Sequence, residues 1–439
     1  MIIIELQQFI NSLVRNSLQL VDYRRIAKLF TGLKGNAKYM NISQFNWAIP
    51  LAWLGFFGPI YMSNLGLSKM EIGLLTSLGF GLQTLNIMMG GYFAEKMGHK
   101  KTVMLFDFIG WPFSMLIFAF AQNVWWFVAG TVILQLSTIA SASWPCLFVE
   151  HTHENKRAKA YAVFQLVNTV AGFTVPIAGL LTDSFGETRG IRIMYLLASL
   201  STAAGVFYRI KYVKDTEVSL LNRKFVNLHF DFRKEFIKFR QGFKKLQSRN
   251  RLFIYFIVQA LVGFGYTMWG AFAVLFWTDP KGMGLPQSSI TVFPAISTTT
   301  TIIFTLLAIP LIKEKDYRKT FVLILLAPIA AAMLYLTGPK GALSFIVVAT
   351  TLNAIFSSFY NPFMASYILN ILPDKERSRT ISVVNTLFTL IYLPAGALAG
   401  WLFTIHPKIL FAFCANLFVI AWIIVFFRFR YEKKRKQAS

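Results

Sequence analysis

Asp107 is the one acidic residue that lies clearly inside an apolar stretch of the sequence, about 9 Å from the start of that stretch at 1.5 Å per helical residue. A charged side chain at the centre of a bilayer costs around 2.5–3.5 kcal/mol on insertion scales, so such a carboxylate needs a partner or a task. We expect Asp107 to pair with Lys100 or Lys101, or to join the charged loop that precedes it. The alternative is a proton-carrying role.

The other reactive or metal-binding side chains form no site that the sequence reveals. His151 and His153 form a His-x-His pair without further ligands, and the spacing of Cys146 and Cys414 offers no metal or disulfide framework. Two Gly-x-Gly pairs lack the strand and the third glycine of a nucleotide-binding loop. We therefore predict no metal, no cofactor and no enzymatic centre.

Twelve apolar stretches must position these residues. A spanning helix needs roughly 20 mostly apolar residues, because in lipid only a helix satisfies its backbone polar groups within one segment. We place the spans at residues 44–64, 71–94, 102–121, 125–149, 160–183, 190–212, 252–278, 288–312, 319–337, 341–369, 379–403 and 407–428. Only 14% of the residues are charged and the mean hydropathy is +0.54, whereas a soluble domain carries about 25% charged residues. The sequence predicts an all-α membrane protein with 12 transmembrane helices.

The net charge of +25 follows membrane topology and does not indicate nucleic-acid binding. With both termini on one side of the membrane, 38 of the 44 Lys and Arg residues fall on that side. The loops of the other side hold the remaining six, which are Lys69, Arg189, Arg192, Lys281, Lys340 and Lys408. This asymmetry is the positive-inside rule. We expect a multi-pass protein of the cytoplasmic membrane with both termini in the cytoplasm and no nucleic-acid partner.

The regions outside the spans divide the chain into parts. Residues 1–43 and 213–251 repeat apolar side chains at helical spacing beside basic ones, so both should lie as amphipathic helices on the anionic inner membrane surface. For residues 213–251 the alternative is a binding platform for a regulator. Residues 44–212 and 252–428 are two six-helix bundles, and residues 429–439 are a basic cytoplasmic tail.

The two bundles are pseudo-symmetric copies of each other. Four pairs of features recur at offsets of 217 to 220 residues: Gly91–Thr102 with Pro310–Thr320, Glu154–Arg157 with Asp374–Arg377, Pro145 with Pro362, and Pro176 with Pro394. Internal repeats of this kind are typical of transporters and help to locate their sites.

The loop after the second span resembles the signature of major facilitator superfamily (MFS) transporters. The family pattern is Gly, three residues, Asp, Arg, any residue, Gly, Arg and two basic residues. Here it stands as Gly91, Glu95, Lys96, Gly98, His99, Lys100 and Lys101. The resemblance covers the chain from residue 44 onward and implies two bundles that rock about a midplane site. The chain departs from the proton-driven drug exporters of that family, because Thr131–Thr138 in span four lacks their arginine.

In the family this loop packs against span eleven and holds the cytoplasmic side shut while the carrier faces outward. Gly91 would let two helices approach closely, Gly98 would permit a tight turn, and Glu95 would face the positive N-terminal end of span eleven. Glu150 matches the place of an acidic partner for Lys96. The predicted cytoplasmic gate comprises Gly91, Glu95, Lys96, Gly98, Lys100, Lys101, Glu150, Arg157 and Arg377. The alternative is that these charges only obey the positive-inside rule.

The resemblance also places a substrate cavity among spans one, four, seven and ten, with help from spans two, five, eight and eleven. The candidates are Trp53, Gln135, Asn168, Gln259, Tyr266, Trp269, Asn353, Tyr360, Asn361 and Asn385, with Gln83 and Asn86 among further polar residues of the helper spans. All are uncharged, which suits a neutral or zwitterionic solute held by hydrogen bonds and stacked on rings. Polar side chains also join helices to one another, so for each residue that role stays open.

We therefore predict a monomeric MFS secondary transporter that moves a small organic solute by alternating access. Its other expected partners are membrane lipids. Protons are a candidate coupling ion, through Asp107 or Glu150, and facilitated uniport is the alternative. Further alternatives are an exporter or flippase of lipophilic compounds or lipids, and a sensor that binds without transport. The sequence fixes neither the substrate nor the direction.

Overall fold

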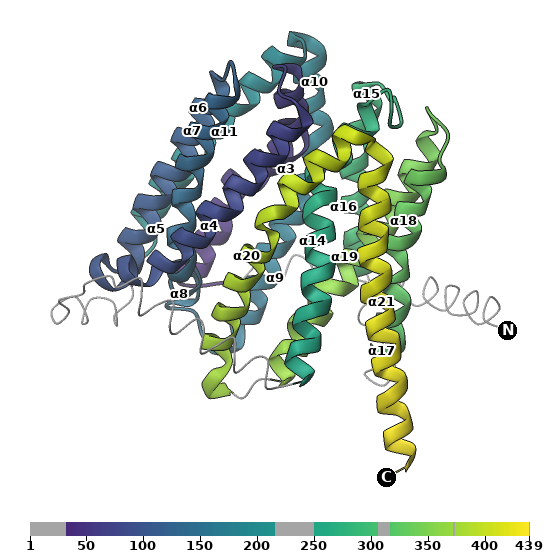
Figure 1. Ribbon diagram of the computed structural model, residues 1–439. Coiled ribbons are helices and arrows are strands. Elements are labelled where there is room, and N and C mark those ends of the chain that lie inside the picture. The colour runs from purple at the N-terminus through teal and green to yellow at the C-terminus, as the bar shows by residue number, and fades with distance from the viewer. Residues whose placement is uncertain (1–31, 216–249, 306–316, 372–373, 439) are drawn as a thin grey trace.

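The computed structural model describes residues 32–215, 250–305, 317–371 and 374–438 (Figure 1). These residues are almost entirely helical and contain no strand, so the predicted all-α class is confirmed for them. Most of the predicted amphipathic segments 1–43 and 213–251 lies outside the described residues, as does most of the repeat at Pro310–Thr320.

The first half of the chain forms six membrane-length units, three of them interrupted. They are α3 (Asn36–Asn64); α4 (Lys69–Met97); α5 (His99–Phe108), η1 (Ile109–Phe113) and α6 (Ser114–Ala119); α7 (Val124–Leu136), η2 (Ser137–Ala142) and α8 (Ser143–Val149); α9 (Glu154–Val170), η3 (Ala171–Thr174) and α10 (Val175–Phe185); and α11 (Glu187–Tyr212).

The described part of the second half contains four long helices and, between the first two of them, four shorter ones. Its helices are α14 (Asn250–Thr278), α15 (Gln287–Ile290), α16 (Phe293–Ile303), α17 (Tyr317–Ile324), α18 (Leu326–Thr337), α19 (Leu343–Ile371), α20 (Asp374–Ile405) and α21 (Pro407–Ala438).

Ten helical segments of the described chain are long and apolar enough to cross a membrane. The two other predicted spans are α3 and the α15–α16 region. Helix α3 has 29 residues, but several amides and two prolines dilute its apolar character. The predicted span at 288–312 is described only as far as residue 305. The structure is therefore consistent with 12 spans.

Local signals explain where these helices begin and end. Ser68 caps α4 in a capping box: the Glu71 backbone N–H donates to Ser68 Oγ at 3.2 Å, and the Ser68 backbone N–H donates to Glu71 Oε2 at 2.7 Å. Gly98 and Gly186 take φ values of 84° and 82°, which glycine adopts without steric cost, and each separates two helices.

Spans three, four and five are interrupted in their middle parts. Pro112 lies in the π-helical turn η1, where the missing backbone N–H of proline breaks the α-helical hydrogen-bond pattern. The hydroxyls of Ser137 and Thr138 donate to the carbonyls of Leu134 and Gln135 at 2.7 Å at the start of the 3-10 turn η2. Such local hydroxyl bonds compensate backbone groups where a membrane helix departs from α geometry.

The two bundles lie side by side, with α3–α11 in purple to blue and α14–α21 in green to yellow (Figure 1). We call the end that contains Gly98 and the C-terminal end of α21 the lower end. The upper end contains Ser68 and Gly186. Close packing between the bundles occurs towards the upper end, where a Cβ atom on Gly73 of α4 would run into the carbonyl oxygen of Gly396 on α20.

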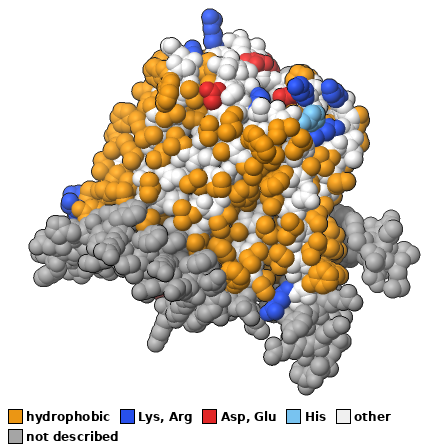
Figure 2. Space-filling model, in the orientation of Figure 1, with side chains coloured by type: hydrophobic (Ala, Val, Ile, Leu, Met, Phe, Trp, Pro, Cys, Tyr) orange, Lys and Arg blue, Asp and Glu red, His pale blue; other side chains and the backbone are white. Residues whose placement is uncertain are grey.

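The face of the described residues that Figure 2 shows is apolar over most of its height, and charged side chains gather at its upper rim. Large side chains such as Trp125, Leu180 and Leu200 are 73%, 62% and 69% exposed. A surface of this kind is compatible with lipid and would aggregate in water.

Candidate substrate site

A strip of contacts between α4 and α20 joins the two halves. Ser77 Oγ accepts a hydrogen bond from the Ala397 backbone N–H at 2.8 Å. Seven residues further along α4, Thr84 Oγ1 donates to Thr389 Oγ1 at 2.9 Å. The ring of Phe80 lies between these points and meets the ring of Tyr392.

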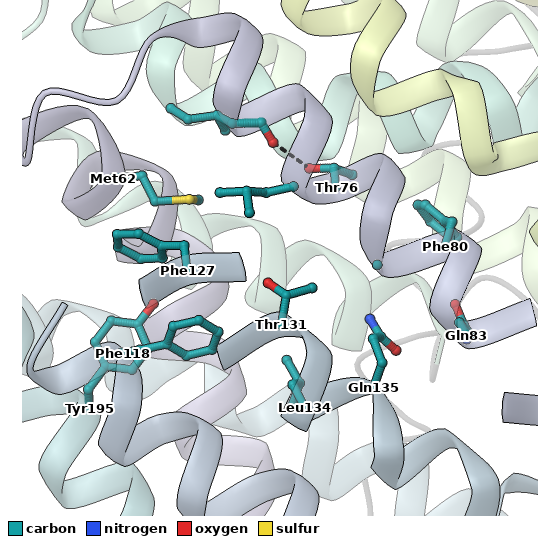
Figure 3. Close-up of a pocket in the computed structure, with 13 residues that line it drawn as sticks. Met62, Thr76, Phe80, Gln83, Phe118, Phe127, Thr131, Leu134, Gln135 and Tyr195 are labelled. Carbon is teal, nitrogen blue, oxygen red and sulfur yellow. Dashed lines mark hydrogen bonds between the residues drawn. The ribbon is translucent and has the colours of Figure 1, made fainter. Parts of the chain in front are cut away.

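A cavity of about 300 Å³ adjoins this strip on the side of the first half (Figure 3). It is lined by Met62, Ile72, Leu75, Thr76, Gly79, Phe80, Gln83, Phe118, Phe127, Thr131, Leu134, Gln135 and Tyr195. The lining residues of α4 recur at steps of three and four, whereas Leu74 and Leu85, which are 47% and 48% exposed, lie on the opposite face of that helix. The cavity therefore faces the interior of the protein and not the lipid.

Three polar side chains of the cavity are available to a solute. Among the described residues, none gives a hydrogen bond to the side chains of Gln83, Thr131 or Gln135, whereas Thr76 Oγ1 donates to the Ile72 carbonyl at 3.1 Å. Figure 3 shows Phe118, Phe127 and Tyr195 gathered on one side, Phe80 and Gln83 on the other, and Thr131 and Gln135 between them. The lining contains no charged side chain.

The sequence predicted Gln83 and Gln135 as cavity residues, and the structure brings both to this one cavity. It missed Phe118, Phe127 and Thr131. Phe118 lies in span three, which is not among the spans that the resemblance assigns to the cavity. Apolar residues of span four carry no signal that separates a cavity wall from the core.

Two further candidates of the first half hold neighbouring helices together. Trp53 Nε1 donates to Thr174 Oγ1 at 2.8 Å. Gln44 Nε2 donates to Asn168 Oδ1 at 2.9 Å, and Asn168 Nδ2 donates to the Phe164 carbonyl at 3.1 Å. Both Trp53 and Asn168 are half-buried, so the structure gives each an interhelical role and places neither in the lining of the cavity.

The candidates of the second half form two hydrogen-bonded pairs. Tyr360 OH donates to Gln259 Oε1 at 2.7 Å, and Tyr266 OH donates to Asn353 Oδ1 at 2.8 Å. Tyr392 adds a third hydrogen bond, in which its hydroxyl donates to the backbone carbonyl of Gln259 at 3.2 Å. These pairs tie α14 to α19 and α20.

The remaining candidates are not brought to these pairs. Trp269 is buried and stacks on Tyr335 with ring centroids 4.8 Å apart, while Phe411 meets it edge-on at 4.9 Å. It therefore packs against α18 and α21 in the buried core. Asn361 and Asn385 are exposed.

Asp107 pairs with a residue that the sequence analysis did not assign to it. Arg209 Nη1 lies 3.2 Å from Asp107 Oδ2, and both side chains are buried. The predicted partners Lys100 and Lys101 are wrong: Lys100 Nζ donates instead to the Ile210 carbonyl at 2.8 Å, and Lys101 is exposed. Arg209 lies in the last turns of predicted span six, and a cation there also needs a partner in lipid. The sequence therefore contained a signal for this pair.

Arg209 is the centre of a buried polar cluster. Its Nε donates to Ser43 Oγ at 2.8 Å, its Nη2 donates to Gln44 Oε1 at 3.2 Å, and its guanidinium lies 3.7 Å from the ring centroid of Trp47. Together with Asp107, these contacts join α5, α11 and α3 within the first bundle. Charge-assisted bonds on several sides compensate the guanidinium for its lost hydration.

The predicted gate residues lie at the lower end. Glu95 and Lys96 are exposed, and Lys96 Nζ donates to Tyr92 OH at 3.2 Å within the same helix. Gly91 has no neighbouring atom within 4 Å of a would-be Cβ. The structure thus does not bring Lys96 to Glu150.

Other gate residues have partners within the first half of the chain. The Glu150 carbonyl accepts a bond from the Asn36 backbone N–H at 3.4 Å. Arg157 forms an exposed ion pair with Glu154 at 3.7 Å, and the Lys100 backbone N–H donates to Asp215 Oδ1 at 3.1 Å. The side chain of Arg377 lies outside the described residues.

Two helical bundles with a cavity beside their contact have the architecture of a membrane transporter. The chain belongs to the Major Facilitator Superfamily, whose sequence model matches residues 40–348 and 315–439. The family predicted from the loop after span two is therefore confirmed.

Individual relatives are distant. The multidrug resistance protein MdtG of Rahnella sp. (strain Y9602) is 25% identical over 178 residues, which are 38% of this chain and 42% of that protein. The chain thus spans less than half the length of this curated relative.

Solved structures show the same fold at low identity. A mutant of the nucleoside transporter NupG has a TM-score of 0.70 at 13% identity, and the match covers 89% of this chain and 99% of that chain. A POT family transporter in complex with 5-aminolevulinic acid gives 0.66 at 14%, covering 94% and 96%. A bacterial homolog of the human lysosomal transporter Spinster gives 0.61 at 14%, covering 89% and 94%.

Proposed function

We propose that this protein moves a small, uncharged organic solute across the cytoplasmic membrane by alternating access. The observation that carries the proposal is the cavity beside the α4–α20 contact, where Gln83, Thr131 and Gln135 offer free polar groups within apolar and aromatic walls. Sites for small molecules have this character: they are mostly apolar, with a few placed polar groups that fix orientation.

The contacts between the halves support a state that is closed at the upper end. Gly73 and Gly396 bring the backbones of α4 and α20 together there, and a Cβ on Gly179 of α10 would lie 3.0 Å from Thr291 Cγ2. In this state the lower gate is released, which agrees with the exposure of Glu95 and Lys96. Rocking of the bundles would separate the upper contacts and engage the gate.

The positive-inside rule assigns the lower end to the cytoplasm, since both termini and 38 of the 44 basic residues belong to that side. We propose a monomer, because one buried core joins both bundles of the chain and the cavity is lined by residues of that chain alone.

Uniport is the mode of transport that the site favours. Asp107 is engaged with Arg209, and the cavity lining contains no carboxylate that could exchange a proton with the solute. Proton coupling through Glu150, or through Asp107 after release from Arg209, is the competing mode.

Export of lipophilic compounds is a second candidate, favoured by the largely apolar lining and by the partial similarity to a multidrug resistance protein. The two candidates differ in the role of the cavity amides, which polar solutes need and lipophilic ones do not.

Flux in proteoliposomes tests the proposal, with solutes chosen by a thermal-shift screen in detergent. A ligand at 100 times its Kd stabilises the folded protein by about 2.7 kcal/mol, which is visible as a raised Tm. The variants Gln135→Leu and Thr131→Val should reduce flux of a polar hit about 10-fold or more. Thr337→Val, at the exposed end of α18, is the matched control. Unchanged flux in both cavity variants would reject the cavity as the transport site.

A further inference from the structure

The free polar groups of the cavity point to one class of solute. This inference rests on the proposed function and narrows it. We infer that the preferred solute is neutral and planar and carries an amide edge, an N–H beside a C=O, as in a lactam or a nucleobase ring.

The two glutamine side chains carry the first step. Gln83 and Gln135 come from neighbouring helices, line the same cavity and have no hydrogen-bond partner among the described residues. A side-chain amide holds a C=O acceptor and an NH₂ donor side by side. A solute edge with one N–H next to one C=O can bond to the acceptor and the donor of one such amide at once. This is the bidentate geometry by which Asn and Gln read a base edge.

The surroundings of Gln135 leave its amide to the cavity. Its backbone carbonyl already accepts bonds from Asn86 Nδ2 and Thr138 Oγ1, both at 2.7 Å. Gly79 lies opposite, and a Cβ at that position would come within 3.0 Å of Gln135 Nε2. The backbone of Gln135 thus anchors the helix, while the missing side chain of Gly79 on α4 leaves room for the Gln135 amide.

The rings account for planarity. Phe118 and Phe127 are stacked with centroids 5.7 Å apart and an interplanar angle of 25°, and they form one wall of the cavity. Phe80 lies across from them. A flat, polarisable ring between these walls gains stacking contacts that a puckered ring of the same volume does not.

The cavity lining contains no charged side chain, which is why we infer a neutral solute. A charged solute would lose its hydration without an ionic partner in the lining, whereas a neutral amide edge replaces its water contacts one for one. A zwitterion, which the sequence left open, is disfavoured on the same ground.

Matched probes test the inference in thermal-shift and competition assays on the full-length protein. Uracil carries the planar ring and the amide edge, 1,3-dimethyluracil keeps the ring without the N–H groups, and dihydrouracil keeps the edge on a puckered ring. We expect uracil to bind, dimethyluracil to bind about 10-fold more weakly or worse, and dihydrouracil to fall between them. In Gln135→Leu the preference for uracil over dimethyluracil should shrink to about 2-fold or less. The amide-to-leucine control is Asn416→Leu, at an exposed position of α21.

Equal binding of uracil and dimethyluracil, or an unchanged preference in Gln135→Leu, would overturn the inference. If none of the three probes binds while a lipophilic compound is transported, the inference fails and the transport function stands. If no solute of any class crosses proteoliposomes that contain folded protein, the proposed function itself fails.

Discussion

The ring of Phe80 on α4 meets the ring of Tyr392 on α20 edge-on, with centroids 6.0 Å apart and an interplanar angle of 77°. Phe80 also lines the cavity, and the hydroxyl of Tyr392 bonds to the backbone of Gln259 on α14. One aromatic pair therefore connects the cavity wall of the first half with the packing of the second. Through this pair, occupancy of the cavity can change the contact between the halves.

Phe80→Ala should lower transport about 10-fold or more while folding persists. The pair itself is worth about 0.5–1.5 kcal/mol, a modest part of the stability, but the cavity loses one wall. Flux and Tm of the purified variant measure the two effects. Phe120→Ala is the control, because that ring is 56% exposed at the end of span three. Equal loss of flux in both variants would contradict the role of Phe80.

Gly73→Ala and Gly396→Ala should open the upper end. At either position a new methyl group would run into the backbone carbonyl of the partner glycine, so the two helices must separate. We expect thiol reagents to label a cysteine introduced at Ala397 several-fold faster in these variants, and uptake to fall. Gly55→Ala is the matched control, since nothing lies within 4 Å of its added Cβ. Labelling that stays at the control rate would refute the closed upper end.

Much of the fold could be predicted from the sequence, because the bilayer leaves the backbone few options. Apolar length locates spans such as residues 407–428, where nearly every side chain is apolar. Apolar length is a weaker signal at Asn36–Asn64, where several amides and two prolines lower the hydropathy of the helix. The family motif then supplied the order and arrangement of the bundles.

The site could be predicted only in part, because sequence identifies a polar residue in a span but not the direction it faces. Gln135 faces the cavity, while Trp269 turns to Tyr335 and Phe411 in its own bundle. The partner of Asp107 was missed for a related reason: Arg209 lies 102 positions away, and only the packing of spans three and six brings them together.

The Asp107–Arg209 pair should behave as a structural ion pair. Asp107→Asn or Arg209→Gln leaves a buried charge without its partner, which typically costs about 3–5 kcal/mol, whereas the double variant Asp107→Asn with Arg209→Gln removes both charges. We expect Tm to fall strongly in each single variant and to recover partly in the double one, a non-additivity that a double-mutant cycle measures. If Asp107→Asn keeps the parental Tm and loses only accumulation driven by a proton gradient, Asp107 is the coupling group instead.

Glu95→Gln should slow transport without destabilising the protein in the state described here. Glu95 is exposed at the lower end, so its charge contributes to stability only when the gate closes against α20. A carboxylate near the N-terminal end of a helix is favoured by about 0.3–1 kcal/mol, so its loss should reduce the closed-gate population by about 2- to 5-fold. Flux measured at saturating solute should fall by a similar factor, with Tm unchanged. Asp183→Asn provides the comparison, because it removes an exposed carboxylate at the upper end of α10, outside the predicted gate. If the two variants lose flux equally, Glu95 contributes only surface charge and the gate must be held by other contacts.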